Sequence, residues 1–139
     1  MNINTKIFIT FSLIFFIEIV SMEPAIFVFQ DENKHEFAFK LVDYKDIQHA
    51  RNLINGETKR PHVTGNIVMG TSIINPTLSF HLNPESIKFV DNVNKTCDVS
   101  IHNLKENTEN SCGDVLEDCY WCNGASKVTK EIQIINSRF

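Results

Sequence analysis

The sequence contains no block of basic residues, no run of about twenty apolar residues and no glycine-rich loop of the kind that holds phosphate groups. Because 13 Lys and Arg stand against 17 Asp and Glu, the net charge is −4, which argues against nucleic acid or an anionic membrane as the partner. No Gly-x-Ser-x-Gly elbow is present, and the histidines are dispersed without metal-ligand spacing. We therefore expect no enzymatic activity, no metal and no cofactor.

The first residues have the pattern of a secretory signal peptide. One Lys precedes a mostly apolar segment, Ile7 to Ile17, and the small residue Ser21 follows it. This segment is too short to span a bilayer, and Glu18 interrupts the apolar sequence, so we prefer cleavage to a membrane anchor. We predict a signal peptide at residues 1–21 and a single secreted domain at residues 22–139, with no stable membrane insertion after cleavage.

All four cysteines lie in the last third of the chain: Cys97, Cys112, Cys119 and Cys122. In an oxidising compartment this even number predicts two disulfides, with three alternative pairings. Cys119 and Cys122 also form a CxxC motif, which is the pattern of thiol–disulfide exchange. A reactive CxxC normally begins a helix, and the acidic residues just before this one would raise thiol pKa values rather than lower them. We therefore favour structural bridges.

Hydrophobic periodicity predicts both strands and helices. A helix over residues 44–55, capped by Asp43, should place its apolar stripe on the sheet. A second helix is predicted to begin at Asn83 and to continue to Leu104, and the alternative is a short strand at 87–90 followed by a shorter helix. The predicted strands, of which the first two form a hairpin, are residues 25–30, 35–42, 62–69, 78–82 and 126–135.

This order of elements predicts an α+β fold: a mostly antiparallel sheet of about five strands, two helices packed on it, and a C-terminal third stapled by disulfides. Gly65, inside a predicted strand, could mark a bulge. The apolar faces of the predicted elements should form a buried core, made by Phe37, Phe39, Leu41, Ile47, Ile54, Val63, Phe80 and Leu82.

A few residues are candidates for binding or modification. Tyr120 and Trp121 lie between two cysteines, and Trp121 either covers the disulfides in the core or serves as an exposed anchor for a partner. His81, in a predicted strand, points away from its apolar neighbours. The long loop region 106–124, made rigid by disulfides, is the predicted binding surface, and the alternative is that its bridges only hold a short domain together. Asn94 begins the N-glycosylation sequon Asn-Lys-Thr.

Several stretches of the chain resemble one family of small secreted domains. They are Phe37 to Leu41 with the helix after it, His62 to Val68, Ser79-Phe80-His81-Leu82, Cys97-Asp98 and Tyr120-Trp121-Cys122. The family is labelled calmodulin-binding protein, after the amino-terminal domain of a larger protein, and the resemblance covers nearly all of residues 25–135. Members carry counterparts of Cys97 and Cys122. The resemblance therefore implies that these two pair, which leaves Cys112 to pair with Cys119, and it implies no catalytic residues.

We predict a secreted, disulfide-stabilised, non-enzymatic domain that binds an unknown extracellular protein or glycan. There are two main alternatives: thiol–disulfide exchange at the Cys-Tyr-Trp-Cys motif, and calmodulin binding, as the family label suggests. Protease inhibition through a loop such as residues 70–76 also stays open. A redox enzyme should show an accessible CxxC sulfur, and an inhibitor should show a rigid convex loop. A binding domain should show an exposed apolar patch.

Overall fold

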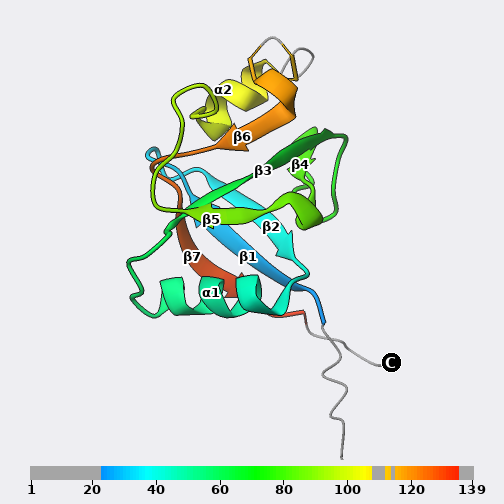
Figure 1. Ribbon diagram of the computed structural model, residues 1–139. Coiled ribbons are helices and arrows are strands. Elements are labelled where there is room, and N and C mark those ends of the chain that lie inside the picture. The colour runs from blue at the N-terminus through cyan, green and yellow to red at the C-terminus, as the bar shows by residue number, and fades with distance from the viewer. Residues whose placement is uncertain (1–22, 108–111, 114, 135–139) are drawn as a thin grey trace, which may run out of the picture.

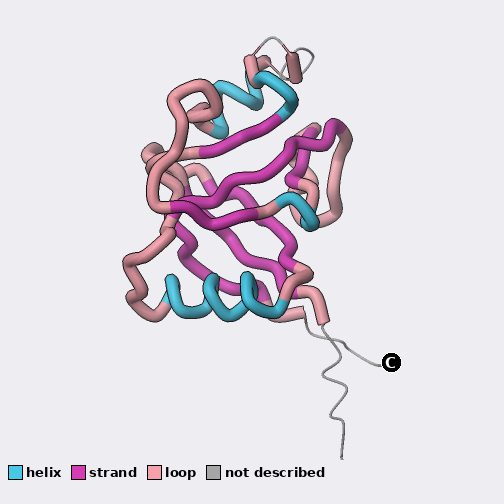
Figure 2. The backbone as a smooth tube through the Cα atoms, in the orientation of Figure 1, coloured by secondary structure: helices cyan, strands magenta, loops and turns pink. Residues whose placement is uncertain are grey.

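The computed structural model describes residues 23–107, 112–113 and 115–134, so the predicted signal peptide lies outside the described residues. These residues form seven strands, two α-helices and two short 3₁₀ helices (Figures 1 and 2). The α+β class is confirmed. The strands divide between two antiparallel sheets, where the sequence predicted one sheet of about five strands.

The first sheet contains β1 (Ala25–Gln30), β2 (Glu36–Leu41) and β7 (Lys127–Ile132), in the order β2-β1-β7. The predicted hairpin is confirmed, because β1 and β2 pair antiparallel along their whole length. The Asp31 carboxylate closes the turn between them by accepting hydrogen bonds from the backbone N–H groups of Asn33 and His35, each at 2.9 Å. The pairing of β1 with β7 shifts register between Val28 and Phe29, so this sheet contains a bulge-like irregularity.

The second sheet is built around β3 (His62–Met69), which pairs antiparallel with β4 (Phe80–Leu82), β5 (Lys88–Val90) and β6 (Tyr120–Cys122). The sequence did not predict β6. Gly65 is not a bulge: it pairs in register with Trp121. A Cβ at Gly65 would lie 3.3 Å from the Ser86 hydroxyl, so the glycine allows the segment before β5 to cross closely over β3.

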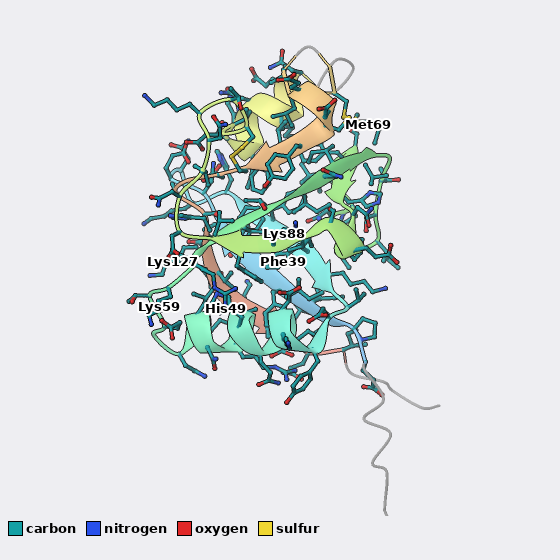
Figure 3. All side chains as sticks on the ribbon, in the orientation of Figure 1. Phe39, His49, Lys59, Met69, Lys88 and Lys127 are labelled. Carbon is teal, nitrogen blue, oxygen red and sulfur yellow. A yellow bond between two sulfur atoms is a disulfide. The ribbon has the colours of Figure 1, made fainter. Side chains whose placement is uncertain are left out.

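The two sheets face each other across an aromatic core. Odd-numbered residues of β1 and β2 point toward the second sheet, where Phe29 stacks on Trp121 with 5.2 Å between ring centroids. Phe37 stacks on Phe80 at 5.7 Å, and Figure 3 shows Phe39 in the interior of the molecule. These rings are almost fully buried, and burial of such large apolar surfaces is the main stabilising term for the fold.

The first helix, α1 (Tyr44–Ile54), begins as predicted, because the Asp43 carboxylate accepts hydrogen bonds from two free backbone N–H groups of the first turn. It crosses one end of the first sheet (Figure 1) and buries Ile47 and Ala50. The prediction that Ile54 is buried was wrong: its side chain is 37% exposed, and it is the last residue of the helix. The other seven predicted core residues are buried.

The prediction of one long helix from Asn83 was wrong, and the alternative is correct. Asn83 caps only a single 3₁₀ turn (Pro84–Ser86), after which the chain extends into β5. A loop over residues 91–100 follows, and the second helix is the short α2 (Ile101–Glu106), capped by Ser100. The second 3₁₀ helix, Glu117–Cys119, leads directly into β6. Within the described residues no helix is long and apolar enough to cross a membrane.

Candidate functional site

A groove of about 430 Å³ lies on the outer face of the first sheet, the face turned away from the aromatic core. Side chains alternate along a strand, so Val28 on β1, Ala38 on β2 and Ile132 on β7 point out of the sheet on this side. Val28 and Ala38 are almost fully buried, whereas Ile132 is 39% exposed. These three apolar side chains form the floor of the groove.

One wall of the groove is the loop between β3 and β4, which Asn75 fixes to the edge of β2. The buried Asn75 amide oxygen accepts a hydrogen bond from the Ala38 N–H at 2.9 Å, and the amide nitrogen donates to the Ala38 carbonyl at 2.6 Å. Asn75 therefore acts as a neighbouring strand would, and it holds Ile74 and Leu78 against the groove.

A second wall is α2, which supplies Ile101, His102 and Lys105. Ile101 is buried and continues the apolar floor, while the other two side chains lie at the rim. The ring of His102 stacks on that of His35, from the turn between β1 and β2, with 6.0 Å between centroids. This contact joins α2 to the first sheet at the end of the groove.

The rim of the groove carries two lysines and one carboxylate. Lys130 on β7 forms an ion pair with Glu36 on β2, with 3.4 Å between the ammonium nitrogen and the carboxylate oxygen. Lys105 forms no ion pair with any residue that the structure describes. The two rim histidines have carboxylate neighbours of their own, at Asp31 and at Glu106. The described lining residues therefore combine apolar side chains with one ion pair and with Lys105, which is not in an ion pair among them.

A second hollow, of about 400 Å³, adjoins the groove, and Ile74 lines both. Its other apolar residues include Ile26 on β1 and Ile134 after β7. Ile73, which also lines it, is 95% exposed and lies in a tight turn that is closed by a hydrogen bond from the Asn75 N–H to the Ser72 carbonyl at 3.0 Å. The outer face thus carries exposed apolar side chains beyond the groove, with Lys40, Ser72 and His81 among them.

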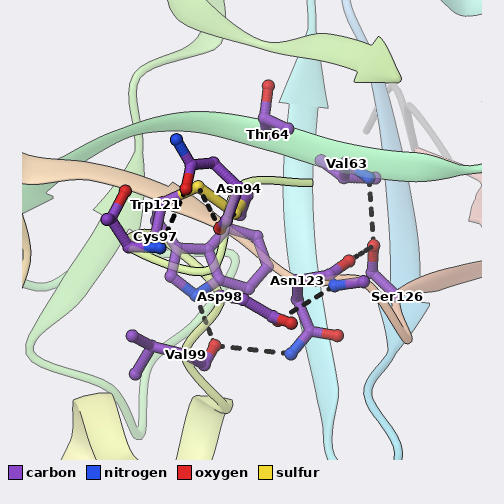
Figure 4. Close-up of a disulfide and its surroundings, with 12 residues drawn as sticks. Val63, Thr64, Asn94, Cys97, Asp98, Val99, Trp121, Asn123 and Ser126 are labelled. Carbon is purple, nitrogen blue, oxygen red and sulfur yellow. Dashed lines mark hydrogen bonds between the residues drawn. A yellow bond between two sulfur atoms is a disulfide. The ribbon is translucent and has the colours of Figure 1, made fainter. Parts of the chain in front are cut away.

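The residues predicted from sequence as a binding surface do not line the groove. Trp121 is 1% exposed, so it is a core residue rather than an exposed anchor, and its indole N–H donates to the Val99 carbonyl at 2.8 Å (Figure 4). Tyr120 is 37% exposed on β6, opposite Asn66 of β3. His81 is half-buried and lines the second hollow, and its ring Nδ1 lies 3.0 Å from the Gly70 carbonyl oxygen. The three predicted residues therefore do not converge on one site.

The cysteines form two disulfides, Cys97–Cys122 and Cys112–Cys119, which is the nested pairing that the family resemblance implied. The two cysteines of the CxxC motif are therefore bonded to different partners. Cys122 is fully buried and Cys97 nearly so, and their bridge joins the loop after β5 to β6 (Figure 4). The described part of region 106–124 exposes Tyr120 and contributes nothing to the groove floor.

The remaining sequence candidates lie apart from the groove. Asn94 is exposed in the loop after β5, not on a helix, and its side chain accepts a hydrogen bond from the Thr96 N–H at 3.2 Å. No cluster of three or more His, Cys, Asp or Glu side chains suited to a metal ion occurs in residues 23–107, 112–113 and 115–134.

Perturbed pKa values also lie outside the groove. Arg51 on α1 donates two hydrogen bonds to Glu131 on β7, at 2.8 and 3.0 Å, and this pairing lowers the pKa of Glu131. Burial, followed by the nearby charge of Asp43, raises the pKa of Asp46. Hydrogen bonds from the backbone N–H groups of the following two residues lower the pKa of Glu57. These shifts accompany capping and tethering of α1, so they indicate structural roles rather than a reaction centre.

The described residues thus form a small α+β domain stabilised by two disulfides, with an open amphipathic groove on one face. The family model described as the BP-74 N-terminal domain matches residues 23–135, and the chain belongs to this family. The match confirms the resemblance to the amino-terminal domain of a larger protein. Neither a curated protein nor a solved structure matches the chain.

Sequence reasoning missed Asn75, Lys105 and Lys130 as site residues, because their roles depend on contacts between distant segments. Asn75 bonds to Ala38 across a separation of 37 residues. One local signal was present: β1 is apolar on both faces, whereas β2 alternates. A strand of this kind is expected to be covered on both sides, and here the second side is the groove.

Proposed function

We propose that this protein is a secreted, disulfide-stabilised, non-enzymatic domain that binds an extracellular ligand in the groove over its first sheet. The observation that carries the proposal is the groove itself, in which the apolar side chains of Ile132, Ile74 and Pro76 remain accessible beside a fixed wall. Ligand sites are typically concave, mostly apolar and largely preformed, with a few polar groups at defined positions. The groove has these properties, and its wall at Asn75 is held by two hydrogen bonds.

Two observations support secretion. Disulfides persist in oxidising compartments, and this domain has two in its C-terminal third. The family match begins at residue 23, which leaves the apolar segment outside the domain. The protein recovered from the medium of expressing cells should begin near Met22, as N-terminal sequencing would show. Intact Met1 in a membrane fraction would contradict this.

The structure offers less support to the alternatives. In a redox CxxC motif the two cysteines bond to each other, but here the partly exposed Cys119 is bonded to Cys112 and the buried Cys122 to Cys97. Calmodulin usually binds a basic amphipathic helix through its apolar face, but α1 buries that face at Ile47 and Ala50. The Ser72–Asn75 segment closes a tight turn, whereas an inhibitory loop has to enter a protease cleft as extended chain.

The proposal can be tested with two isoleucines of nearly equal exposure. Ile132 is 39% exposed and lies in the groove, while Ile54 is 37% exposed on α1. We expect Ile132→Glu to abolish capture of extracellular material by the immobilised secreted protein, because it places a charge on the apolar floor. Ile54→Glu is the matched control and should leave capture unchanged.

The same assay separates the groove from the disulfide-braced loop. Joint replacement of Cys112 and Cys119 by Ser removes the inner bridge and leaves Cys97–Cys122 in place. Unchanged capture by this folded double variant would assign binding to the groove. If the double cysteine variant loses capture while Ile132→Glu captures normally, the binding site lies in region 106–124 and the proposal is refuted.

A further inference from the structure

We propose that β2 is a self-complementary edge strand that Asn75 keeps closed, and that release of Asn75 lets two copies of the chain pair antiparallel through β2, with Ala38 at the twofold axis. The partner that this edge fits is therefore a second copy of the chain. This pairing does not depend on the proposed ligand site. It follows from the backbone groups at the edge of β2, the order of residues along this strand and the place of Asn75 beside it.

The free edge of β2 carries backbone groups that can pair with another strand. The order β2-β1-β7 leaves one side of β2 without a strand partner. Because the N–H and C=O of Ala38 both bond to Asn75, they point away from β1. Residues two positions away in an antiparallel strand share this direction, so Glu36 and Lys40 present their N–H and C=O groups at the same edge. Among the described residues, neither backbone has a partner there, and such an edge is a template for another chain.

The order of residues along β2 is self-complementary. Residues 36–40 read Glu-Phe-Ala-Phe-Lys. When two such strands run antiparallel with Ala38 opposite Ala38, Glu36 of each copy lies opposite Lys40 of the other. The opposed residues can then exchange backbone hydrogen bonds, and the opposite charges stabilise the pairing. A shift of the register by two residues loses both charge pairs, so the sequence favours a single register.

The side chain of Asn75 closes only the middle of this edge. The groove borders β2 at Glu36, and the second hollow borders it at Lys40, so the edge is open on both sides of Asn75. Among the described residues, the only hydrogen bonds between β2 and the loop that carries Asn75 are the two to Ala38. The tip of this loop packs against little, since Ile73 is 95% exposed. The wild-type chain therefore keeps its groove wall and stays unpaired, and the dimer forms only when this wall is released.

The test compares the oligomeric state of folded variants by sedimentation equilibrium. We expect the wild-type protein to stay monomeric over the micromolar range, and Asn75→Ala to form dimers whose share rises with concentration. Asn75→Ser is the milder variant for the case that Asn75→Ala does not fold. Its hydroxyl can still bond to one group of Ala38, so it should dimerise more weakly. Thr77→Ala, at an exposed position in the same loop, is the matched control and should stay monomeric.

The register is tested by exchanging charges in the Asn75→Ala background. Lys40→Glu places like charges opposite each other at two symmetric positions, so dimer formation should weaken about tenfold. Adding Glu36→Lys restores opposite charges with their signs exchanged, and dimer formation should recover. Lys45→Glu makes the same change at an exposed lysine on α1, and this matched control should leave the dimer intact.

Three results would overturn the proposal: a folded Asn75→Ala or Asn75→Ser that stays monomeric, wild-type dimers as strong as those of the variant, or dimers that are indifferent to Lys40→Glu. Open-ended aggregation in place of a dimer would overturn it as well, because pairing about one twofold axis closes at two copies. None of these results depends on capture by the groove, so the proposed function stands or falls separately.

Discussion

Asn75 should be one of the most sensitive positions outside the aromatic core. It is only 7% exposed, and its side chain bonds to both backbone polar groups of Ala38. Replacing it by Ala removes both partners at once and frees the loop that forms one wall of the groove. The perturbation therefore acts on stability and on the proposed site together.

The magnitude follows from the two hydrogen bonds. A buried backbone group left without a partner costs about 1–3 kcal/mol, so the two groups of Ala38 together set a range of about 2–6 kcal/mol. Ala38 lies beside the open groove, where water can replace part of the lost bonding, so we expect Asn75→Ala to cost about 2–4 kcal/mol. Asn75→Asp should cost more, because it puts a carboxylate oxygen against the Ala38 carbonyl and buries a charge.

Urea denaturation followed by fluorescence measures this loss directly, because the chain has one tryptophan and Trp121 is stacked on Phe29 in the core. Thr77→Ala, at an exposed position in the same loop, is the control and should change stability by less than about 0.5 kcal/mol. A loss below about 0.5 kcal/mol for Asn75→Ala, or an Asp variant more stable than the Ala variant, would refute the assigned role.

Three other measurements test the stability of α1 and the sequon. Arg51 lowers the pKa of Glu131, so their pair stabilises the fold fully at a pH above the pKa that Glu131 has in the unfolded state. This stabilisation is lost as the pH falls through the pKa of Glu131 in the folded state. Glu131→Gln should therefore cost up to about 1 kcal/mol at neutral pH and almost nothing in acid. A cost that persists in acid, measured by urea denaturation, would contradict this. Ile47→Ala should cost about 2–5 kcal/mol because its side chain is buried, and Ile54→Ala less than about 1 kcal/mol; equal losses would show that α1 is oriented differently. Asn94→Gln should remove a glycan and increase the gel mobility of protein secreted by eukaryotic cells, and unchanged mobility would mean that the exposed sequon is not used.

The elements that the sequence predicted correctly are those with strong local signals. The β1–β2 hairpin and α1 follow from alternation, a polar turn and the Asp43 cap, all contained in short stretches of chain. The long second helix failed for a different reason. Apolar residues at spacings of three and four run from Val90 to Leu104, but Lys88–Val90 gains strand partners in β3, and Cys97 is bonded to Cys122. Contacts between distant segments overrode the local periodicity.

The strand β6 could not be predicted because it has only three residues, Tyr120–Cys122, and exists through its pairing with β3. The same pairing decides the environment of Trp121. An aromatic residue between two cysteines is compatible with an exposed anchor or with a core position, and the register opposite Gly65 places it inside. The choice between these two interpretations required knowledge of the sheet.

The residues of the groove cannot be recognised from the composition of the chain, although their placement on the outer face follows from simple chemistry. Neither Ala38 nor Lys105 is unusual in type, and no motif joins them. Once β1 lies between β2 and β7, however, its apolar residue Val28 must face outward, because Phe27 and Phe29 already fill the inner face. An outward apolar side chain needs a cover, and Val28 is only 4% exposed at the bottom of the groove that the Asn75 loop and α2 border. The accessible apolar surface of the groove therefore comes mainly from Ile132 rather than from the middle strand, which is why Ile132→Glu is the decisive variant for the proposed binding.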